Sequence, residues 1–318
     1  MSMKKSKPAA NHYSRRKFIG TTAAAVAGLS VVPGSVFGSP AFSNRPVKTS
    51  SVINGVKIGV IAPYAFRRMH GNTVEELLDA INETGISLVE MQIPPVEAFL
   101  GAPPRDDREE LSRWREMADM SGYEDLRRMY NDAGVEFYGF KEAITHEMSD
   151  AECDYLFNAT KALGAWQLTM ELPRNDDDGT LTNRIGQLAT RHQILVAYHN
   201  HTQANFNFWD RAIWQSQYNG LNLDIGHYVA GTNDSPIPLI ERHWDRIGSL
   251  HLKDRKINNG DNMPWGEGDT PIAEVLQLMR DRNAEFVATI ELEYPVPDGS
   301  DAVQEIKKCL EYCRQALA

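Results

Sequence analysis

Short apolar runs alternate with longer amphipathic stretches along the chain after about residue 55. Residues 56–63, VKIGVIAP, have the apolar and β-branched character of a buried strand. Residues 73–85 follow the pattern of a helix, with Thr73 and Glu76 spaced as a capping box and Gly85 at the end. The same order recurs to the C-terminus, which predicts eight strand-then-helix units.

The remaining units are predicted from the same periodicity. Strands are expected at 86–94, 135–141, 165–173, 193–201, 221–227, 248–254 and 285–295. Helices are expected at 124–134, 149–164, 180–192, 207–218, 235–247, 270–283 and 301–317, and residues 94–107 are expected to form a Pro-rich and charged loop. This alternation favours parallel strands covered by helices.

Eight such units in roughly 260 residues are typical of a closed (β/α)₈ TIM barrel, so the expected fold class is α/β. A doubly wound open sheet is the alternative. Its first strand-to-helix turn should carry a glycine-rich phosphate loop, whereas residues 62–73 read APYAFRRMHGNT. We therefore expect the barrel.

The N-terminus resembles a twin-arginine export signal. Basic residues and the pair Arg15 and Arg16 precede an Ala/Gly-rich apolar stretch, and small residues follow near 35–39. We expect a signal peptide at 1–39, a linker at 40–54, one catalytic barrel at 55–318 and a periplasmic location. The apolar stretch is short for a membrane span and no Cys follows it, so no stable membrane anchor is expected.

The charge and the cysteine content restrict the partners and the roles that we expect for this chain. The formal net charge is −10, and no run of Lys or Arg follows the N-terminal segment, which argues against nucleic acid as a partner. The three cysteines, Cys153, Cys309 and Cys313, cannot all pair, and the last two lie one helical turn apart. We interpret them as small packing residues.

Chemically active side chains gather where the expected strands end. In a TIM barrel the catalytic groups project from these C-terminal ends. The residues concerned are Glu90, Glu171, His199, His201, Asp224, His227, His251, Lys253, Glu291 and Glu293. Buried charges need compensation, and mixed oxygen and imidazole ligands suit one divalent ion, Mn²⁺, Co²⁺, Mg²⁺ or Zn²⁺.

Four segments of the C-terminal half carry a family resemblance. LNLDIGHYVAG, SLHLKDRK, WGEGD and ATIELE resemble the xylose-isomerase-like barrel superfamily of sugar isomerases, epimerases and inosose dehydratases. The resemblance implies a metal held by Glu, Asp, His and Glu at the ends of strands five to eight. Asp224, His251 and Glu291 match the last three, whereas His199 stands where the first glutamate is expected.

The other residues receive expected roles. Glu171, His201, His227 and Lys253 are the catalytic candidates, and for Glu171 a role as ligand or as base is left open. Glu90, Asn200, Trp265 and Glu293 are expected to contact substrate. In ketose epimerases the glutamates of strands five and eight also act as the acid and base, so His199 departs from that symmetrical mechanism.

The sequence therefore predicts a metal-dependent sugar isomerase or epimerase that acts through an enediolate on a small carbohydrate. A lyase or hydratase of a keto sugar, such as a 3-keto-glycoside, would use the same intermediate and is the alternative. An abasic-site endonuclease and a non-catalytic sugar-binding protein are weaker alternatives. A homo-oligomer is left open.

Overall fold

The chain forms a closed barrel of eight parallel strands in a computed structural model that describes residues 50–67 and 72–318. The strands are β2 (Val56–Ala62), β3 (Leu88–Gln92), β4 (Glu136–Lys141), β5 (Gln167–Glu171), β6 (Leu195–His199), β7 (Asn219–Asp224), β8 (Ile247–Leu252) and β11 (Val287–Ile290). Each strand pairs with the next, and β11 pairs with β2 to close the ring. The predicted (β/α)₈ TIM barrel is confirmed.

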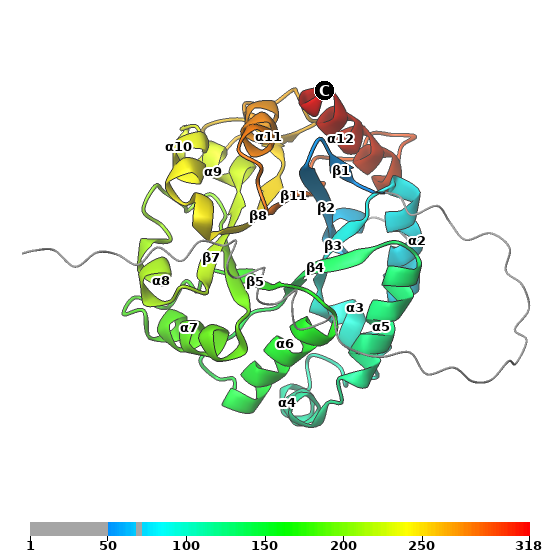
Figure 1. Cartoon of the computed structure of the whole chain (residues 1–318), viewed down its shortest axis with the longest axis vertical. Coiled ribbons are helices and arrows are strands. Elements are labelled where there is room, and N and C mark those ends of the chain that lie inside the picture. Colours follow the sequence, from blue (N-terminus) through cyan, green and yellow to red (C-terminus); the bar gives the residue numbers. More distant parts are fainter. Residues whose placement is uncertain (1–49, 68–71) are drawn as a thin grey trace, which may run out of the picture. The chain divides into compact units, whose positions relative to one another are not determined.

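Helices surround the strands (Figure 1). They are α2 (Val74–Thr84), α3 (Ile93–Phe99), α4 (Arg108–Met117), α5 (Ser121–Asp132), α6 (Asp150–Ala162), α7 (Thr180–His192), α8 (Asp210–Gln215), α9 (Ile225–Thr232), α10 (Ile237–Arg242), α11 (Ile272–Asp281) and α12 (Ala302–Leu317). The capping box expected at Thr73 is present, because Thr73 accepts from the Glu76 amide and Glu76 accepts from the Thr73 amide. Short 3₁₀ turns follow β2 (Tyr64–Phe66) and α10 (Trp244–Arg246).

The barrel unit begins before the expected boundary at residue 55. A short strand, β1 (Val52–Ile53), pairs antiparallel with β2, and Ser51 is buried with its hydroxyl donating to the Ile58 carbonyl at 2.6 Å. The C-terminal end of the expected linker is therefore part of the fold. The expected signal peptide at 1–39 lies outside the described residues.

The structure differs from the elements expected from the sequence at two places, near Pro94 and at Asp224. The expected loop after Pro94 instead contains α3, because Pro94 and Pro95 occupy the first turn of this helix, where a missing amide hydrogen is tolerated. The strand expected at 221–227 ends at Asp224, whose side chain caps α9. Strand and helix therefore meet at a single residue.

Polar side chains fill the lumen of the barrel below its C-terminal ends. They come from five different strands, are all fully buried and hydrogen bond to one another: Tyr138, Gln167, Asn222, Ser249 and Thr289. A buried polar group is stable only when it is hydrogen bonded, so this layer is held in defined orientations. It forms the floor beneath the residues that the sequence assigned to the site.

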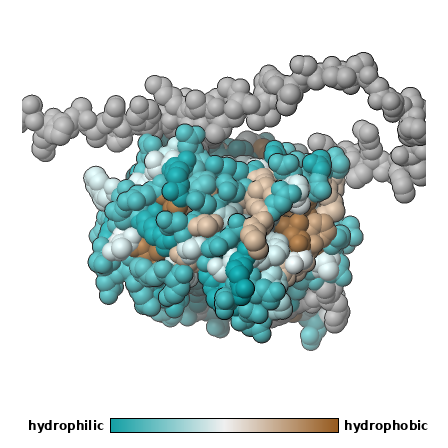
Figure 2. All heavy atoms as spheres, turned by 90° about the horizontal axis from the view of Figure 1, so that it is seen from below, coloured by the Kyte–Doolittle hydropathy of each residue, from teal (hydrophilic) through white to brown (hydrophobic). Residues whose placement is uncertain are grey.

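The hydrophilic surface and the buried cysteines agree with the expectations from the sequence. Figure 2 shows one face, where hydrophilic residues cover most of the area and hydrophobic residues form smaller patches. Cys153, Cys309 and Cys313 are buried and unpaired within the described part of the chain, as expected for packing residues. Among residues 50–67 and 72–318, no helix is long and apolar enough to cross a membrane.

Candidate metal and acid-base site

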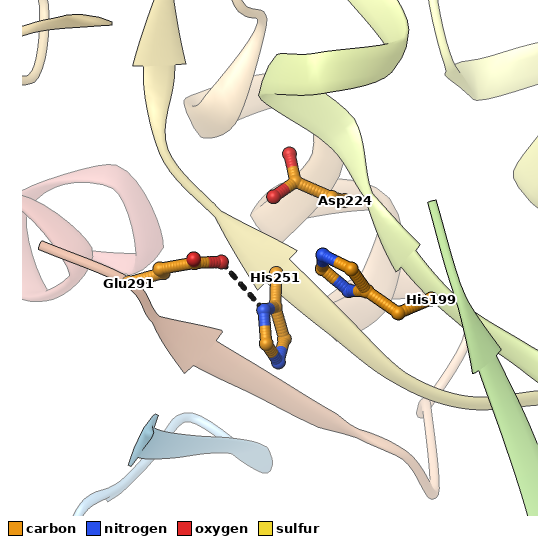
Figure 3. A group of neighbouring side chains, drawn as sticks. All are labelled: His199, Asp224, His251 and Glu291. Atoms are coloured by element: carbon orange, nitrogen blue, oxygen red, sulfur yellow. Dashed lines mark hydrogen bonds and ion pairs between the residues drawn. The ribbon is translucent and has the colours of Figure 1, made fainter. Parts of the chain in front are cut away.

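Four side chains from four neighbouring strands meet at the C-terminal end of the barrel. One ligand atom from each lies within 4.8 Å of the others, and all four residues are buried: His199, Asp224, His251 and Glu291. Figure 3 shows the imidazole of His199 and the carboxylate of Asp224 facing the His251 and Glu291 pair. The sequence predicted this set, and the structure brings its members together.

His199 is the last residue of β6 and contributes a neutral imidazole. Burial, together with the charges of Lys141 and His251, holds the pKa of His199 well below its usual value. Its Nδ1 atom lies 2.5 Å from Oδ1 of Asn222 on β7. A neutral imidazole with one nitrogen occupied keeps the other for a metal ion.

Asp224 ends β7 and is fully buried. Its Oδ1 atom accepts the His227 amide at 2.7 Å, which caps α9. Its Oδ2 atom lies 3.0 Å from the Lys253 ammonium but accepts no well-aligned hydrogen bond from the described residues. This oxygen therefore retains capacity for a cation.

His251 lies between two carboxylates. Its Nδ1 atom is 2.6 Å from Oε2 of Glu291, and its Nε2 atom is 3.0 Å from Oε2 of Glu90. Burial alone would lower the pKa of His251, but these carboxylates raise it to about 9. Glu90, expected to contact substrate, is fully buried and also accepts from the Tyr138 hydroxyl at 2.8 Å. Its placement instead supports His251.

Lys253 places a buried ammonium beside the same ligands. Its Nζ atom is 3.0 Å from Asp224 and 3.2 Å from Glu291, and it also pairs with Glu293. Burial alone would lower the pKa of Lys253, but the three carboxylates hold it above its usual value. Glu293 further accepts from the Tyr64 hydroxyl at 2.7 Å and lies partly open.

Glu171 and His201 form a second, more open pair. The His201 Nε2 atom is 3.1 Å from the Glu171 carboxylate, and each side chain is 43% exposed. Burial alone would raise the pKa of Glu171, but the His201 hydrogen bond and the charge of Lys141 lower it. Glu171 and His201 form a second potential ligand group with His199, so a ligand role for Glu171 stays open.

His227 lies between the two groups, with its ring 4.8 Å from that of His201. Its Nδ1 atom is 2.7 Å from a guanidinium nitrogen of Arg255, and its Nε2 atom is 3.1 Å from the Lys253 ammonium. Burial and the Lys253 charge lower the pKa of His227 to about 3, so the imidazole is neutral. Both neighbours are cations that only donate, so one ring nitrogen of His227 accepts from its cation and the other carries the single proton of the neutral ring.

Asn200 and Trp265 were expected to contact substrate. Asn200 is fully buried and joins β6 to β7, accepting the Asp224 amide at 2.8 Å and donating to the Asp224 carbonyl at 3.2 Å. It therefore positions the backbone of Asp224. Trp265 packs edge to face on Tyr312 of α12 with ring centroids 5.7 Å apart, so a contact with substrate stays a prediction.

The loop that carries Trp265 is tied to the end of β8. Asp254 accepts three backbone amides of this loop, from Gly266, Gly268 and Thr270, at 2.8, 2.9 and 3.1 Å. A side chain at residue 268 would collide with the Asp254 carboxylate, which explains a glycine there. Asp254 thus caps the following loop.

Three residues of the site were not anticipated from the sequence: Lys141, Asn222 and Arg255. Asn222 precedes Asp224 by two positions and so shares its face of the strand, which is the one signal that could have revealed it. Arg255 follows Lys253 by two positions in the same way. Their partners come from other helices and strands, so their roles depend on how these elements are arranged in the barrel.

The residues fit a divalent ion. The group offers two imidazoles and two carboxylates, a donor set that suits Mn²⁺, Co²⁺ or Zn²⁺. Asp224 keeps an oxygen without a well-aligned donor among the described residues, and His251 has the carboxylate partner that metal-bound histidines commonly use. A metal at this position would replace the proton that His251 shares with Glu291.

Solved structures of similar fold support the architecture. A structure named 3-keto-D-glucoside 4-epimerase from E. coli is 14% identical, with 82% of this chain and 99% of that chain covered and a TM-score of 0.58. The probable 3-DHS dehydratase of petrobactin synthesis from Bacillus anthracis is 13% identical, with coverages of 80% and 98% and a TM-score of 0.57.

A structure of the IOLI protein with a bound zinc atom is 12% identical, with coverages of 82% and 98% and a TM-score of 0.57. No curated protein matches the chain. The model of the family described as xylose isomerase-like TIM barrel matches residues 53–315, which is nearly the whole barrel unit. The chain therefore belongs to the xylose isomerase-like TIM barrel family.

Proposed function

We propose that the protein is a divalent-metal-dependent sugar isomerase or epimerase, which moves a proton next to a carbonyl through an enediolate. The observation that carries this proposal is the buried four-residue ligand group with the open Glu171 and His201 pair beside it. A buried ligand group beside acid-base groups that are open to solvent suits metal-assisted proton transfer.

The ion would be held by the four buried residues, His199, Asp224, His251 and Glu291. When bound, it supplies a Lewis acid that stabilises negative charge on a substrate oxygen. Lys253 adds a fixed positive charge close to the same position and can stabilise a developing oxyanion.

The groups placed to transfer protons are the open pair, Glu171 and His201, and His227. His201 faces the Glu171 carboxylate at 3.1 Å, so an imidazole that takes a proton from carbon would be stabilised by an adjacent negative charge. The His227 ring lies 4.8 Å from that of His201, so its imidazole is placed to return a proton to the substrate. One group removes a proton from carbon and another delivers a proton, as inversion at that carbon in epimerisation needs.

A keto-sugar lyase or hydratase, for example of a 3-keto-glycoside, is the second candidate. It is favoured by His199, which replaces one of the two carboxylates that a symmetrical epimerase uses as acid and base. Similar folds named as a keto-glucoside epimerase and a probable dehydratase are compatible with either outcome.

The test is NMR spectroscopy of aldoses, ketoses and 3-keto-glycosides incubated with Zn²⁺- or Mn²⁺-loaded protein in deuterated water. Deuterium next to the carbonyl of an isomeric product would support the first proposal, and an unsaturated or hydrated product would support the second. Binding of these sugars without deuterium incorporation, by wild type and Glu171→Gln alike, would contradict both and indicate a sugar-binding protein.

We also propose that the chain is exported by the twin-arginine route to the periplasm and acts there on a small carbohydrate. This rests on the N-terminal sequence alone. Replacement of Arg15 and Arg16 by lysine should retain the protein in the cytoplasm, as measured by cell fractionation. An unchanged distribution would contradict export by this route.

A further inference from the structure

A buried chain of hydrogen bonds runs under the site from Glu90 to His199. His199 Nδ1 lies 2.5 Å from Oδ1 of Asn222, and Asn222 Nδ2 donates to Ser249 Oγ at 2.6 Å. Ser249 lies within hydrogen-bonding reach of Tyr138, whose hydroxyl donates to Glu90 at 2.8 Å and also pairs with Thr289. These residues are between 0% and 2% exposed, so water does not supply alternative partners.

The direction of this chain follows from its end at Glu90. A carboxylate only accepts, so the Tyr138 proton points to Glu90 and the Tyr138 oxygen accepts from the hydroxyls of Thr289 and Ser249. Ser249 has one proton, and it is used there. Ser249 Oγ therefore accepts from its other two neighbours, the amide groups of Asn222 at 2.6 Å and Gln167 at 2.8 Å.

This direction decides how the Asn222 amide is turned. With its NH₂ group on Ser249, Asn222 presents its oxygen to His199, and an amide oxygen only accepts. Nδ1 of His199 must then carry the proton of the neutral ring. The Nε2 lone pair is left for the space shared with Asp224 and His251.

Glu90 also receives the Nε2 proton of His251 at 3.0 Å. The same carboxylate thus orients one imidazole directly and the other through Tyr138, Ser249 and Asn222. We propose that Asn222 is a positioning residue that holds His199 in its Nδ1–H tautomer, and that Glu90 orients both imidazole ligands, His251 directly and His199 through the Tyr138–Ser249–Asn222 chain. The inference rests on the proposed metal site.

The first test is the tautomer itself, measured by long-range ¹H–¹⁵N NMR on metal-free wild-type protein labelled in histidine. The Nδ1–H form of His199 is expected. The Nε2–H form would overturn the proposal. This measurement requires no variant, no metal and no substrate.

The second test is Zn²⁺ affinity by calorimetry. Asn222→Leu should weaken Zn²⁺ binding about 10- to 100-fold, the range usual for loss of a partner behind a ligand. Asn222→Asp keeps an acceptor for Nδ1 and should retain the affinity within about threefold. An Asn222→Leu protein that binds Zn²⁺ as wild type does would overturn the proposal.

Asn219→Leu is the matched control. Asn219 lies on the same strand and is equally buried, but its amide donates to the Ala212 and Thr182 carbonyls at 2.8 and 3.4 Å. The folded fraction of the Asn219→Leu protein, quantified by thermal unfolding, should bind Zn²⁺ with the wild-type affinity. If the tautomer and affinity results hold while no sugar is turned over, the proposed function fails and this inference stands.

Discussion

The ammonium nitrogen of Lys253 lies 3.0 Å from Oδ2 of Asp224, so a candidate metal ligand is already paired with a cation of the chain itself. Both side chains are almost completely buried. Removing one partner of a buried pair leaves the other charge uncompensated, which commonly costs about 3–5 kcal/mol. The pair therefore explains how the barrel tolerates its cluster of carboxylates before a metal binds.

We expect Lys253→Met to lower the free energy of unfolding of the metal-free protein by about 3–5 kcal/mol. Zn²⁺ should restore more stability to this variant than it adds to wild type, because the ion replaces the missing positive charge. Urea unfolding with a chelator and with Zn²⁺ measures both effects. Lys256→Met, at a lysine that is 43% exposed and 3.5 Å from Asp269, is the control and should change little.

Glu90→Gln should weaken Zn²⁺ binding about 10- to 100-fold although residue 90 is not a ligand. The reason is that Glu90 accepts the Nε2 proton of His251 and anchors the hydrogen-bond chain to His199. Calorimetric titration measures the affinity. Glu97→Gln removes another buried carboxylate, which pairs with Arg115 at 2.7 Å outside the site, and should reduce stability without changing affinity. Equal affinities for both variants would contradict the assignment.

Metal uptake should release about one proton per chain at neutral pH. Glu90 and Glu291 raise the pKa of metal-free His251 to about 9, so an ion must displace the Nδ1 proton. A higher pH favours the exchange of this proton for the ion. The apparent affinity for Zn²⁺ should therefore rise about tenfold per pH unit up to about pH 9 and then level off. Calorimetry in two buffers of different ionisation enthalpy measures the released proton.

The same raised pKa has a consequence for the metal-free fold. The pKa of His251 is about 9 in the folded protein and 6.5 in the unfolded chain. Between pH 6.5 and about 9 the folded protein therefore binds one proton on His251 that the unfolded chain does not. The stabilisation is complete below 6.5 and is lost as the pH rises through 9. Urea unfolding across this interval should show a decline that Zn²⁺ removes, and a rise in stability would contradict it.

His227→Ala should reduce turnover of the substrate found by the NMR screen about 10²- to 10⁴-fold, as for loss of a general acid. Zn²⁺ affinity should stay within about threefold, because His227 lies outside the ligand group. His243→Ala is the matched control, since His243 is 8% exposed against 7% for His227 and lies away from the site. A parallel fall in affinity and turnover would assign His227 a structural role.

The fold could be predicted because strands buried on both faces read as apolar runs, and the helices between them carry caps and amphipathic spacing. The ligand group could be predicted because alternation in a strand fixes which residue at its end turns inward. Helix α3 was missed because Pro94 and Pro95 suggested a loop, although proline also suits a first helical turn.

The supporting residues could not be predicted because their roles depend on which strands face one another. Glu90 looks like a rim carboxylate in the sequence, yet it is enclosed by His251 and Tyr138 from distant segments. Asn222 becomes informative only when the register places it beside His199. Local patterns thus identify the candidate ligands, whereas the groups that orient them need the closed barrel.

Asp224 ends a strand, begins a helix and contributes to the ligand group within one side chain. Replacement of this residue would therefore alter the candidate metal site, the start of α9 and the placement of His227 together. Few other residues could end the strand, cap the helix and serve in the ligand group, as Asp224 does. Glu171 lies on an open edge and has fewer such roles. Changes of substrate preference during evolution should accordingly accumulate around Glu171 and leave Asp224 untouched.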